Sequence, residues 1–130
     1  MQFSACAMTE PHTERPTVIV VDDDADLRAA LRYSLEIEGF DVMSCASGES
    51  LLELPLPTSP ACLVVDQRLS GISGIAAIET LRDRHIDLPA IIITGTPSAD
   101  LRARSLLANA RVVEKPLLSG LLSGAIRDVI

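Results

Sequence analysis

The chain has 130 residues, of which 48% are hydrophobic, 22% charged and 2% aromatic, and its formal net charge at pH 7 is −7. This length suits one domain with a core of aliphatic side chains, and no apolar run is long enough to span a bilayer. The negative charge argues against direct binding to nucleic acid, which needs a basic surface. We therefore expect a single acidic domain with no direct contact to nucleic acid or membrane.

Residues 1–16 form a polar, irregular segment that we interpret as a disordered lead-in to one folded domain over residues 17–130. The segment lacks the basic start and long apolar block of a secretory signal. Cys6, Cys45 and Cys62 form no CxxC pair, so neither a metal site nor a disulfide framework is indicated. Reduced thiols in a cytoplasmic protein are the expected state.

Strands and helices alternate along the predicted domain. In chain order, the pattern predicts a strand at 17–21, a helix from 26 that stops at 39, a strand at 40–45, a short helix between 47 and 55, a strand at 61–65, a helix at 72–84, a strand at 89–93, a helix from 97 with Leu101, Leu106 and Leu107 as its apolar residues, a strand at 110–113 and a helix at 117–129. Asp24 is expected to cap the first helix, Gly39 to end it, and Pro97 to lie in the first turn of the fourth. Five strands separated by helices imply an α/β fold with a parallel sheet covered on both faces.

Polar side chains stand at the carboxyl ends of four predicted strands. The first strand ends in Asp22 and Asp23, the third in Asp66, the fourth in Thr94 and the fifth in Lys115. In a parallel sheet these ends share one edge, where open α/β sheets bind ligands. Each residue alone is more often a cap, a turn residue or a solvated charge. Together, three carboxylates that recruit Mg²⁺, a lysine and a hydroxyl indicate a phosphoryl-transfer site with Asp66 as nucleophile.

The chain resembles a receiver domain of a bacterial two-component response regulator, from about Thr17 to its C-terminus. Four ordered motifs carry this resemblance: VIVVDDDADLR at 18–28, LVVDQRLSGISG at 63–74, IIITG at 91–95 and VVEKP at 112–116. The resemblance implies a three-layer flavodoxin-like (βα)5 fold, whose five-stranded parallel sheet has the strand order 2-1-3-4-5.

The same resemblance implies a role for each site residue. Asp66 would accept a phosphoryl group from a sensor histidine kinase or a histidine phosphotransfer protein, so the chain would be a signalling phosphoacceptor rather than an enzyme. Mg²⁺ or Mn²⁺ would be held by four groups: the carboxylates of Asp22, Asp23 and Asp66, and the backbone carbonyl of Arg68. Thr94 and Lys115 would contact the phosphoryl group, and the bond from Lys115 to Pro116 would be cis.

Phosphorylation in this family alters a surface that a downstream protein or output domain contacts. Two positions depart from the family pattern: Ser70 stands where proline is usual, and Val112 stands where a Tyr or Phe turns inward on activation. The last helix carries a wide apolar stripe with Gly120 and Gly124 one turn apart. We interpret the stripe as a core face, with a homodimer contact through this helix as the alternative.

Two other functions stay open at this point. A receiver-like protein-binding module would act without phosphorylation, and the changes at Ser70 and Val112 fit it, although every acidic residue and the lysine are present. A phosphohydrolase of the haloacid dehalogenase class also uses an aspartate at a strand end, with an acid two residues later and a threonine shortly beyond. Asp22 and Asp24 have that separation, but no threonine follows them closely.

Overall fold

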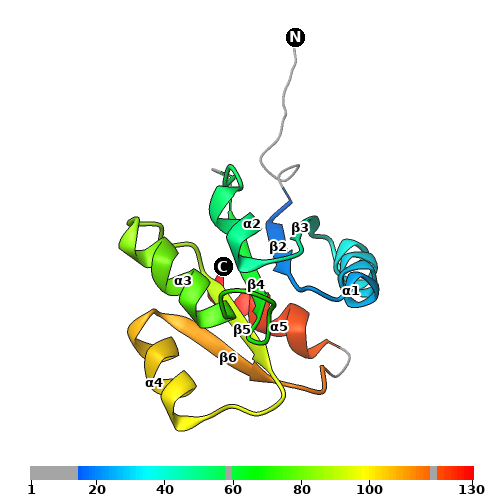
Figure 1. The fold of residues 1–130 in the computed structure, drawn as a ribbon. Helices are drawn as coiled ribbons and strands as arrows, with labels where there is room; N and C mark the ends of the chain where they lie inside the picture. The colour runs from blue at the N-terminus through cyan, green and yellow to red at the C-terminus, as the bar shows by residue number, and fades with distance from the viewer. Residues whose placement is uncertain (1–14, 58–59, 118–119) are drawn as a thin grey trace.

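The computed structural model describes residues 15–57, 60–117 and 120–130, and the fold is drawn in Figure 1. Ten elements follow one another along the chain: β2 (Thr17–Val21), α1 (Ala25–Ile37), β3 (Asp41–Cys45), α2 (Gly48–Glu53), β4 (Ala61–Asp66), α3 (Gly74–Asp83), β5 (Ala90–Thr94), α4 (Ala99–Leu107), β6 (Ala110–Glu114) and α5 (Leu121–Val129). All strand pairs are parallel, and the sheet order is β3-β2-β4-β5-β6. This order is 2-1-3-4-5 in chain order, so the predicted fold class is confirmed.

The sheet forms the middle of three layers. Helices α1 and α5 cover one face, and α2, α3 and α4 cover the other (Figure 1). Because successive strand residues point to opposite faces, Val18 and Val20 of β2 pack with α1 and α5, whereas Ile19 and Val21 pack on the opposite side. No helix in the described part of the chain is both long and apolar enough to cross a lipid bilayer.

The first helix has the ends that its sequence predicts. Asp24 accepts hydrogen bonds from the backbone N–H groups of Asp26 and Leu27 at 3.0 and 3.3 Å, which makes it the N-cap of α1. Gly39 follows the helix with a φ of +100°, a left-handed conformation that glycine adopts without steric cost.

The fourth helix differs from its prediction in where it begins and in which of its leucines are buried. Helix α4 begins at Ala99 with Ser98 as its N-cap, so Pro97 precedes the helix instead of lying in its first turn. Leu101 is buried as expected, but Leu106 and Leu107 are 81% and 89% exposed. Leu101 and Ser105, four residues apart, form the buried face of this helix, and Leu106 and Leu107 follow on its exposed side. Apolar character alone therefore does not identify the buried leucines of α4.

The last helix is shorter than predicted. Helix α5 begins at Leu121, and Gly120 precedes it in a left-handed conformation with a φ of +79°. Residues 118–119, where the predicted helix also ran, lie outside the described residues. Leu122 and Ile126 of the apolar stripe are buried against the sheet, which supports its interpretation as a core face. Only one of the two glycines, Gly124, lies within the helix.

Contacts with the folded domain begin at Arg15, within the segment expected to be a lead-in. The Arg15 guanidinium donates to the carbonyl oxygens of Glu36, Gly39 and Phe40 at the end of α1. The carbonyl oxygen of Pro16 accepts a hydrogen bond from the backbone N–H of Asp41 at the start of β3. The expected disorder of residues 1–14 lies outside the described residues.

The two cysteines of the described chain are free and buried. Burial raises the pKa of the Cys62 thiol to about 12 and also raises the pKa of Cys45. Because the thiolate is the reactive form, we expect iodoacetamide at neutral pH to leave both thiols unmodified until the protein is unfolded. Mass spectrometry of a Cys6→Ser variant, with and without guanidinium, measures this; rapid alkylation of folded protein at Cys62 would contradict it.

Candidate functional site

Three carboxylates converge at the carboxyl edge of the sheet. Asp22 and Asp23 directly follow β2, and Asp66 is the last residue of the neighbouring strand β4. The register pairs Val21 with Val65, which sets Asp22 beside Asp66. Asp22, Asp23 and Asp66 each place one carboxylate oxygen within 4.8 Å of the others. Asp22 and Asp66 are buried, whereas Asp23 faces solvent.

The residues predicted for the site line a single cavity. Its volume is about 500 Å³, and its lining includes all six: Asp22, Asp23, Asp66, Arg68, Thr94 and Lys115. The structure thus brings together side chains from four strand ends that are up to 93 residues apart in sequence, between Asp22 and Lys115. The physical reason is the parallel sheet, which places every strand end at the same edge.

A cation lies against the central carboxylate. Lys115 follows β6, and its Nζ is 3.5 Å from Oδ1 of Asp66. The backbone N–H of Lys115 donates to the carbonyl oxygen of Thr94 at 2.8 Å, which extends the pairing of β5 with β6 up to the site. The bond from Lys115 to Pro116 is cis, as the resemblance implies. The ammonium group offsets part of the negative charge of the cluster.

Asp22 is the carboxylate that burial affects most clearly. Loss of hydration raises the pKa of Asp22, and the charges of Asp66 and Asp23 raise it further. A hydrogen bond from the backbone N–H of Asp24 at 2.8 Å and the charge of Lys115 act in the opposite direction. Without a bound cation the ionised cluster is therefore held together against its own repulsion.

Replacing Asp22 with asparagine should stabilise the metal-free protein at pH 7. We expect on the order of 1 kcal/mol, a fraction of the ~4 kcal/mol that two unit charges 4 Å apart feel near a protein surface. Because the folded-state pKa of Asp22 lies above its unfolded value, wild type loses stability at this group as pH rises through the folded-state pKa. The gain should therefore be full at pH 7 and shrink toward about pH 4. Thermal unfolding in EDTA between about pH 4 and pH 7 measures this gain in stability, and Asp83→Asn, a substitution at an exposed aspartate, is the control. If Asp22→Asn were less stable than wild type at pH 7, repulsion within the cluster would not be the dominant effect at Asp22.

The start of α3 packs directly against the strand that carries Asp66. A Cβ added at Gly74 would lie 2.5 Å from the carbonyl oxygen of Asp66 and 3.0 Å from Cα of Gln67. The Gln67 side chain accepts a hydrogen bond from the backbone N–H of Ile75 at 2.8 Å, and the backbone carbonyl oxygen of Gln67 accepts one from the backbone N–H of Gly74 at 3.1 Å. Glycine is required at position 74 because main chain meets main chain there, and this close approach holds the backbone of Asp66 in place.

Thr94 supplies the hydroxyl of the site from the end of β5. The residue is 7% exposed, and its hydroxyl oxygen accepts a hydrogen bond from the backbone N–H of Thr96 at 3.2 Å. In the described part of the chain this hydroxyl donates no hydrogen bond, so its proton is available for a ligand in the cavity. On the neighbouring strand Val112 pairs with Ile92 and is half-buried, so an aliphatic side chain occupies the position where the family has an aromatic ring.

Asp24 has a structural task beside the site. Its Oδ1 accepts both hydrogen bonds that cap α1, so the carboxylate points at the helix terminus. This orientation disfavours Asp24 as the general acid that a phosphohydrolase of the haloacid dehalogenase class would need two residues after Asp22. The capping role was predicted for this residue, and it explains the third aspartate of the run.

Ser70 and Arg28 also contact the acidic residues, although neither is predicted from the sequence as a site residue. Ser70 donates two hydrogen bonds to Asp23. Arg28 Nη1 donates to the carbonyl oxygen of Asp22 at 2.6 Å from the first turns of α1. The departure from the family's proline is the sequence signal at Ser70, and Arg28 is named only as the end of the first motif.

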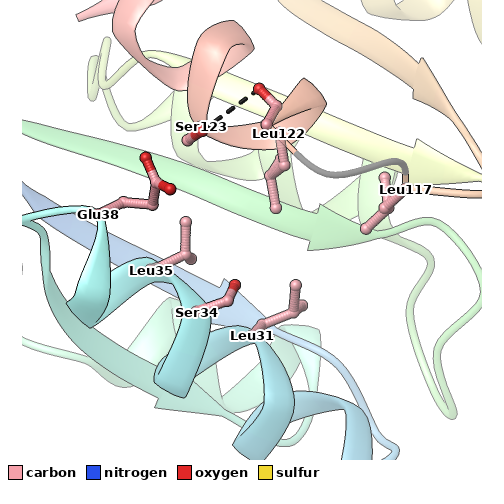
Figure 2. Close-up of a pocket in the computed structure, with 8 residues that line it drawn as sticks. Leu31, Ser34, Leu35, Glu38, Leu117, Leu122 and Ser123 are labelled. Carbon is pink, nitrogen blue, oxygen red and sulfur yellow. Dashed lines mark hydrogen bonds between the residues drawn. The ribbon is translucent and has the colours of Figure 1, made fainter.

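A second cavity lies between α1 and α5. Its volume is about 170 Å³, and Figure 2 shows Leu31, Leu35 and Leu122 facing into it from the two helices. Glu38 is the charged residue in its lining. This mostly apolar space lies on the face of the sheet covered by α1 and α5, and it offers neither the clustered carboxylates nor the cation of the first cavity.

The sheet order, together with an acidic cluster and a lysine at its carboxyl edge, defines a doubly wound α/β domain of the receiver class. A family model for the response regulator receiver domain matches residues 18–127. The chain belongs to this family. As a receiver domain, it is a phosphoacceptor module of two-component signal transduction.

Individual relatives are longer than this chain. The C4-dicarboxylate transport transcriptional regulatory protein DctD of Pseudomonas aeruginosa is 31% identical over 121 residues, which cover 92% of this chain and 26% of DctD. The transcriptional regulatory protein FixJ of Azorhizobium caulinodans is 32% identical over 111 residues, covering 85% of this chain and 53% of FixJ. The chain therefore spans about a quarter to a half of these proteins.

A solved structure shows the same fold. Response regulator protein TrrA from Thermotoga maritima, in complex with Mg(2+)-BeF, matches with a TM-score of 0.75 at 23% identity. The match covers 88% of this chain and 99% of that chain. It supports the three-layer arrangement derived above from strand order and core packing.

Proposed function

We propose that Asp66 is the phosphoacceptor of this receiver, and that Mg²⁺ or Mn²⁺ binds beside it. The ion would be held by four groups: the carboxylates of Asp22, Asp23 and Asp66, and the backbone carbonyl of Arg68. The observation that supports this most is the convergence of the three carboxylates within 4.8 Å, with Lys115 Nζ 3.5 Å from Asp66. Asp66 is the central carboxylate, because among the described residues it is the one that forms an ion pair with the ammonium group.

The donor set fits the ion. Carboxylate and carbonyl oxygens are hard ligands, and Mg²⁺ keeps several water molecules when one or a few carboxylates bind it. The open cavity of about 500 Å³ has room for those waters and for a phosphoryl group. The TrrA complex, which contains Mg(2+)-BeF, supports the same assignment by its likeness in fold.

The chain's own residues then perform the transfer. A carboxylate oxygen of Asp66 attacks the phosphorus of the donor, the new oxygen–phosphorus bond forms, and the bond from phosphorus to the donor histidine nitrogen breaks. Lys115 and the hydroxyl of Thr94 lie at the cavity to contact the phosphoryl oxygens. The bound ion would neutralise charge on the carboxylates and the phosphoryl oxygens.

The donor in this proposal is a sensor histidine kinase or a histidine phosphotransfer protein, and the product presents a changed surface to a downstream protein or output domain. The modification adds about −1.5 to −2 charge at Asp66. We place this exchange in the cytoplasm, where the free thiols of Cys45 and Cys62 stay reduced. A homodimer through α5 is not part of the proposal, because most of its apolar stripe packs on the sheet.

Acetyl phosphate with Mg²⁺ tests the proposal without a partner protein. We expect intact-protein mass spectrometry to show one phosphoryl adduct, and reductive trapping of the acyl phosphate followed by peptide mapping to locate it at Asp66. EDTA should prevent the adduct. An unmodified wild type under these conditions would favour a protein-binding module that works without phosphorylation, and an adduct mapped elsewhere would overturn the role of Asp66.

A further inference from the structure

Ser70 binds the exposed aspartate of the cluster across 47 residues of sequence. Its backbone N–H and its hydroxyl both donate to Oδ2 of Asp23, at 3.2 and 3.1 Å. Two donors on one oxygen fix the direction of the carboxylate, and its other oxygen, Oδ1, takes no part in these two bonds. A proline at position 70 would supply neither donor, because it has no N–H and no hydroxyl.

The restraint on Asp23 has a physical reason. Asp22 and Asp66 hold carboxylate oxygens within 4.8 Å of one on Asp23, and Asp23 is exposed. Like charges at that distance repel, so an unrestrained Asp23 side chain would turn toward solvent and away from the other two. The hydrogen bonds from Ser70 oppose this rotation and keep the Asp23 carboxylate close to those of Asp22 and Asp66.

Helix α2 holds the loop that presents Ser70. Glu49, in the first turn of α2, accepts a hydrogen bond through Oε2 from the backbone N–H of Ile72 at 3.1 Å. A side chain at Gly71, where φ is +83°, would collide with the Glu49 carboxylate. A Cβ added at Gly48 would lie 2.7 Å from Cγ1 of Ile72. The residues next to Ser70 are therefore packed closely against α2.

We propose that Ser70 is a positioning residue for the divalent-cation site, which orients Asp23 as a ligand, and that Glu49 acts through Ser70 by fixing its loop. The inference rests on the proposed role of Asp23 in binding the ion. Removing a hydrogen-bond partner of a metal ligand typically lowers the metal affinity by about 10- to 100-fold. Ser70 acts on affinity, so its effect is measurable without any phosphoryl transfer.

Calorimetric titration with MgCl₂ tests the role of Ser70. We expect Ser70→Ala to raise the Mg²⁺ dissociation constant roughly tenfold, because the hydroxyl bond is lost and the N–H bond remains. Ser70→Thr keeps both donors and should bind as wild type does. Ser44→Ala, an exposed serine replaced on β3, is the matched control and should also leave the affinity unchanged. All variants should unfold at a similar temperature in EDTA, because the bonds from Ser70 to Asp23 are exposed.

Glu49 is tested with a pair of variants that separates its charge from its hydrogen bond. Glu49→Ala should weaken Mg²⁺ binding, whereas Glu49→Gln, which removes the charge and keeps an acceptor for Ile72, should bind nearly as wild type does. The double variant Ser70→Ala with Glu49→Ala should be little weaker than Ser70→Ala alone, because both changes act on the same contact with Asp23.

The outcomes separate this inference from the proposed function. Mg²⁺ binding by wild type, with equal or tighter binding by Ser70→Ala, would overturn the positioning role and leave the assignment of Asp66 untouched. Additive losses in the double variant would overturn the part assigned to Glu49. A wild type that binds no Mg²⁺ would overturn the metal site and, with it, the role of Ser70.

Discussion

Asp66→Asn should leave the chain unable to accept a phosphoryl group from acetyl phosphate, while wild type is modified in the presence of Mg²⁺. The amide oxygen of asparagine carries no full charge and forms no acyl phosphate, so we expect the rate of adduct formation to fall by at least roughly 1,000-fold. The substitution preserves the shape of the side chain, and Gly74 still packs against the backbone of residue 66. Mass spectrometry over a time course measures the loss.

Stability measurements show whether the variant is folded. Asp66 is 8% exposed and lies among like charges, so its neutralisation should not lower the unfolding temperature in EDTA. Mg²⁺ binding should weaken, because the variant loses one of the three carboxylates. Asp83→Asn, at the exposed end of α3, changes the net charge equally without touching the cavity and should be phosphorylated as wild type is. A variant at Asp66 that still gains the adduct at the wild-type rate would show that another carboxylate is the acceptor.

The strand ends of this fold are predictable because their signals are local. The run from Thr17 to Val21 consists of β-branched residues and stops at three aspartates, and β2 has the same bounds. Three later strands extend one residue beyond their predicted ends, to Asp66, Thr94 and Glu114. The polar residues at these strand ends are still paired in the sheet, and apolar patterns stop before them.

The contacts that organise the site further are long-range and escape such patterns. Ser70 contacts Asp23, and Arg15 contacts the end of α1, only once the chain is folded. No spacing of residues in the sequence predicts these contacts. Exposure of Leu106 and Leu107 likewise depends on which face of α4 packs on the sheet, and Leu101 and Ser105 form that face. The departure from proline at position 70 marked a position of interest, but only the structure shows that its two donors meet a carboxylate of the cluster.

Lys115→Ala should slow phosphorylation and strengthen Mg²⁺ binding at the same time. Removing a preorganised donor that stabilises transition-state charge costs about 100- to 1,000-fold in rate, and the ammonium is 3.5 Å from the Asp66 carboxylate. The same ammonium competes with a divalent ion for negative charge, so its loss should lower the Mg²⁺ dissociation constant. Rates from acetyl phosphate and calorimetric titration measure the two effects, which have opposite signs.

The opposite signs distinguish a charge at the phosphoryl group from a merely structural lysine, whose loss would weaken both processes. Lys115→Arg keeps the charge on a larger, planar group and should recover part of the rate. Lys115 is also the only lysine in the sequence, so reductive methylation with ¹³C labels a single side-chain amine. Its NMR signal should shift when Asp66 is phosphorylated and remain in place in the Asp66→Asn variant treated in the same way. If the NMR signal does not shift when Asp66 is phosphorylated, the Lys115 amine does not contact the phosphoryl group.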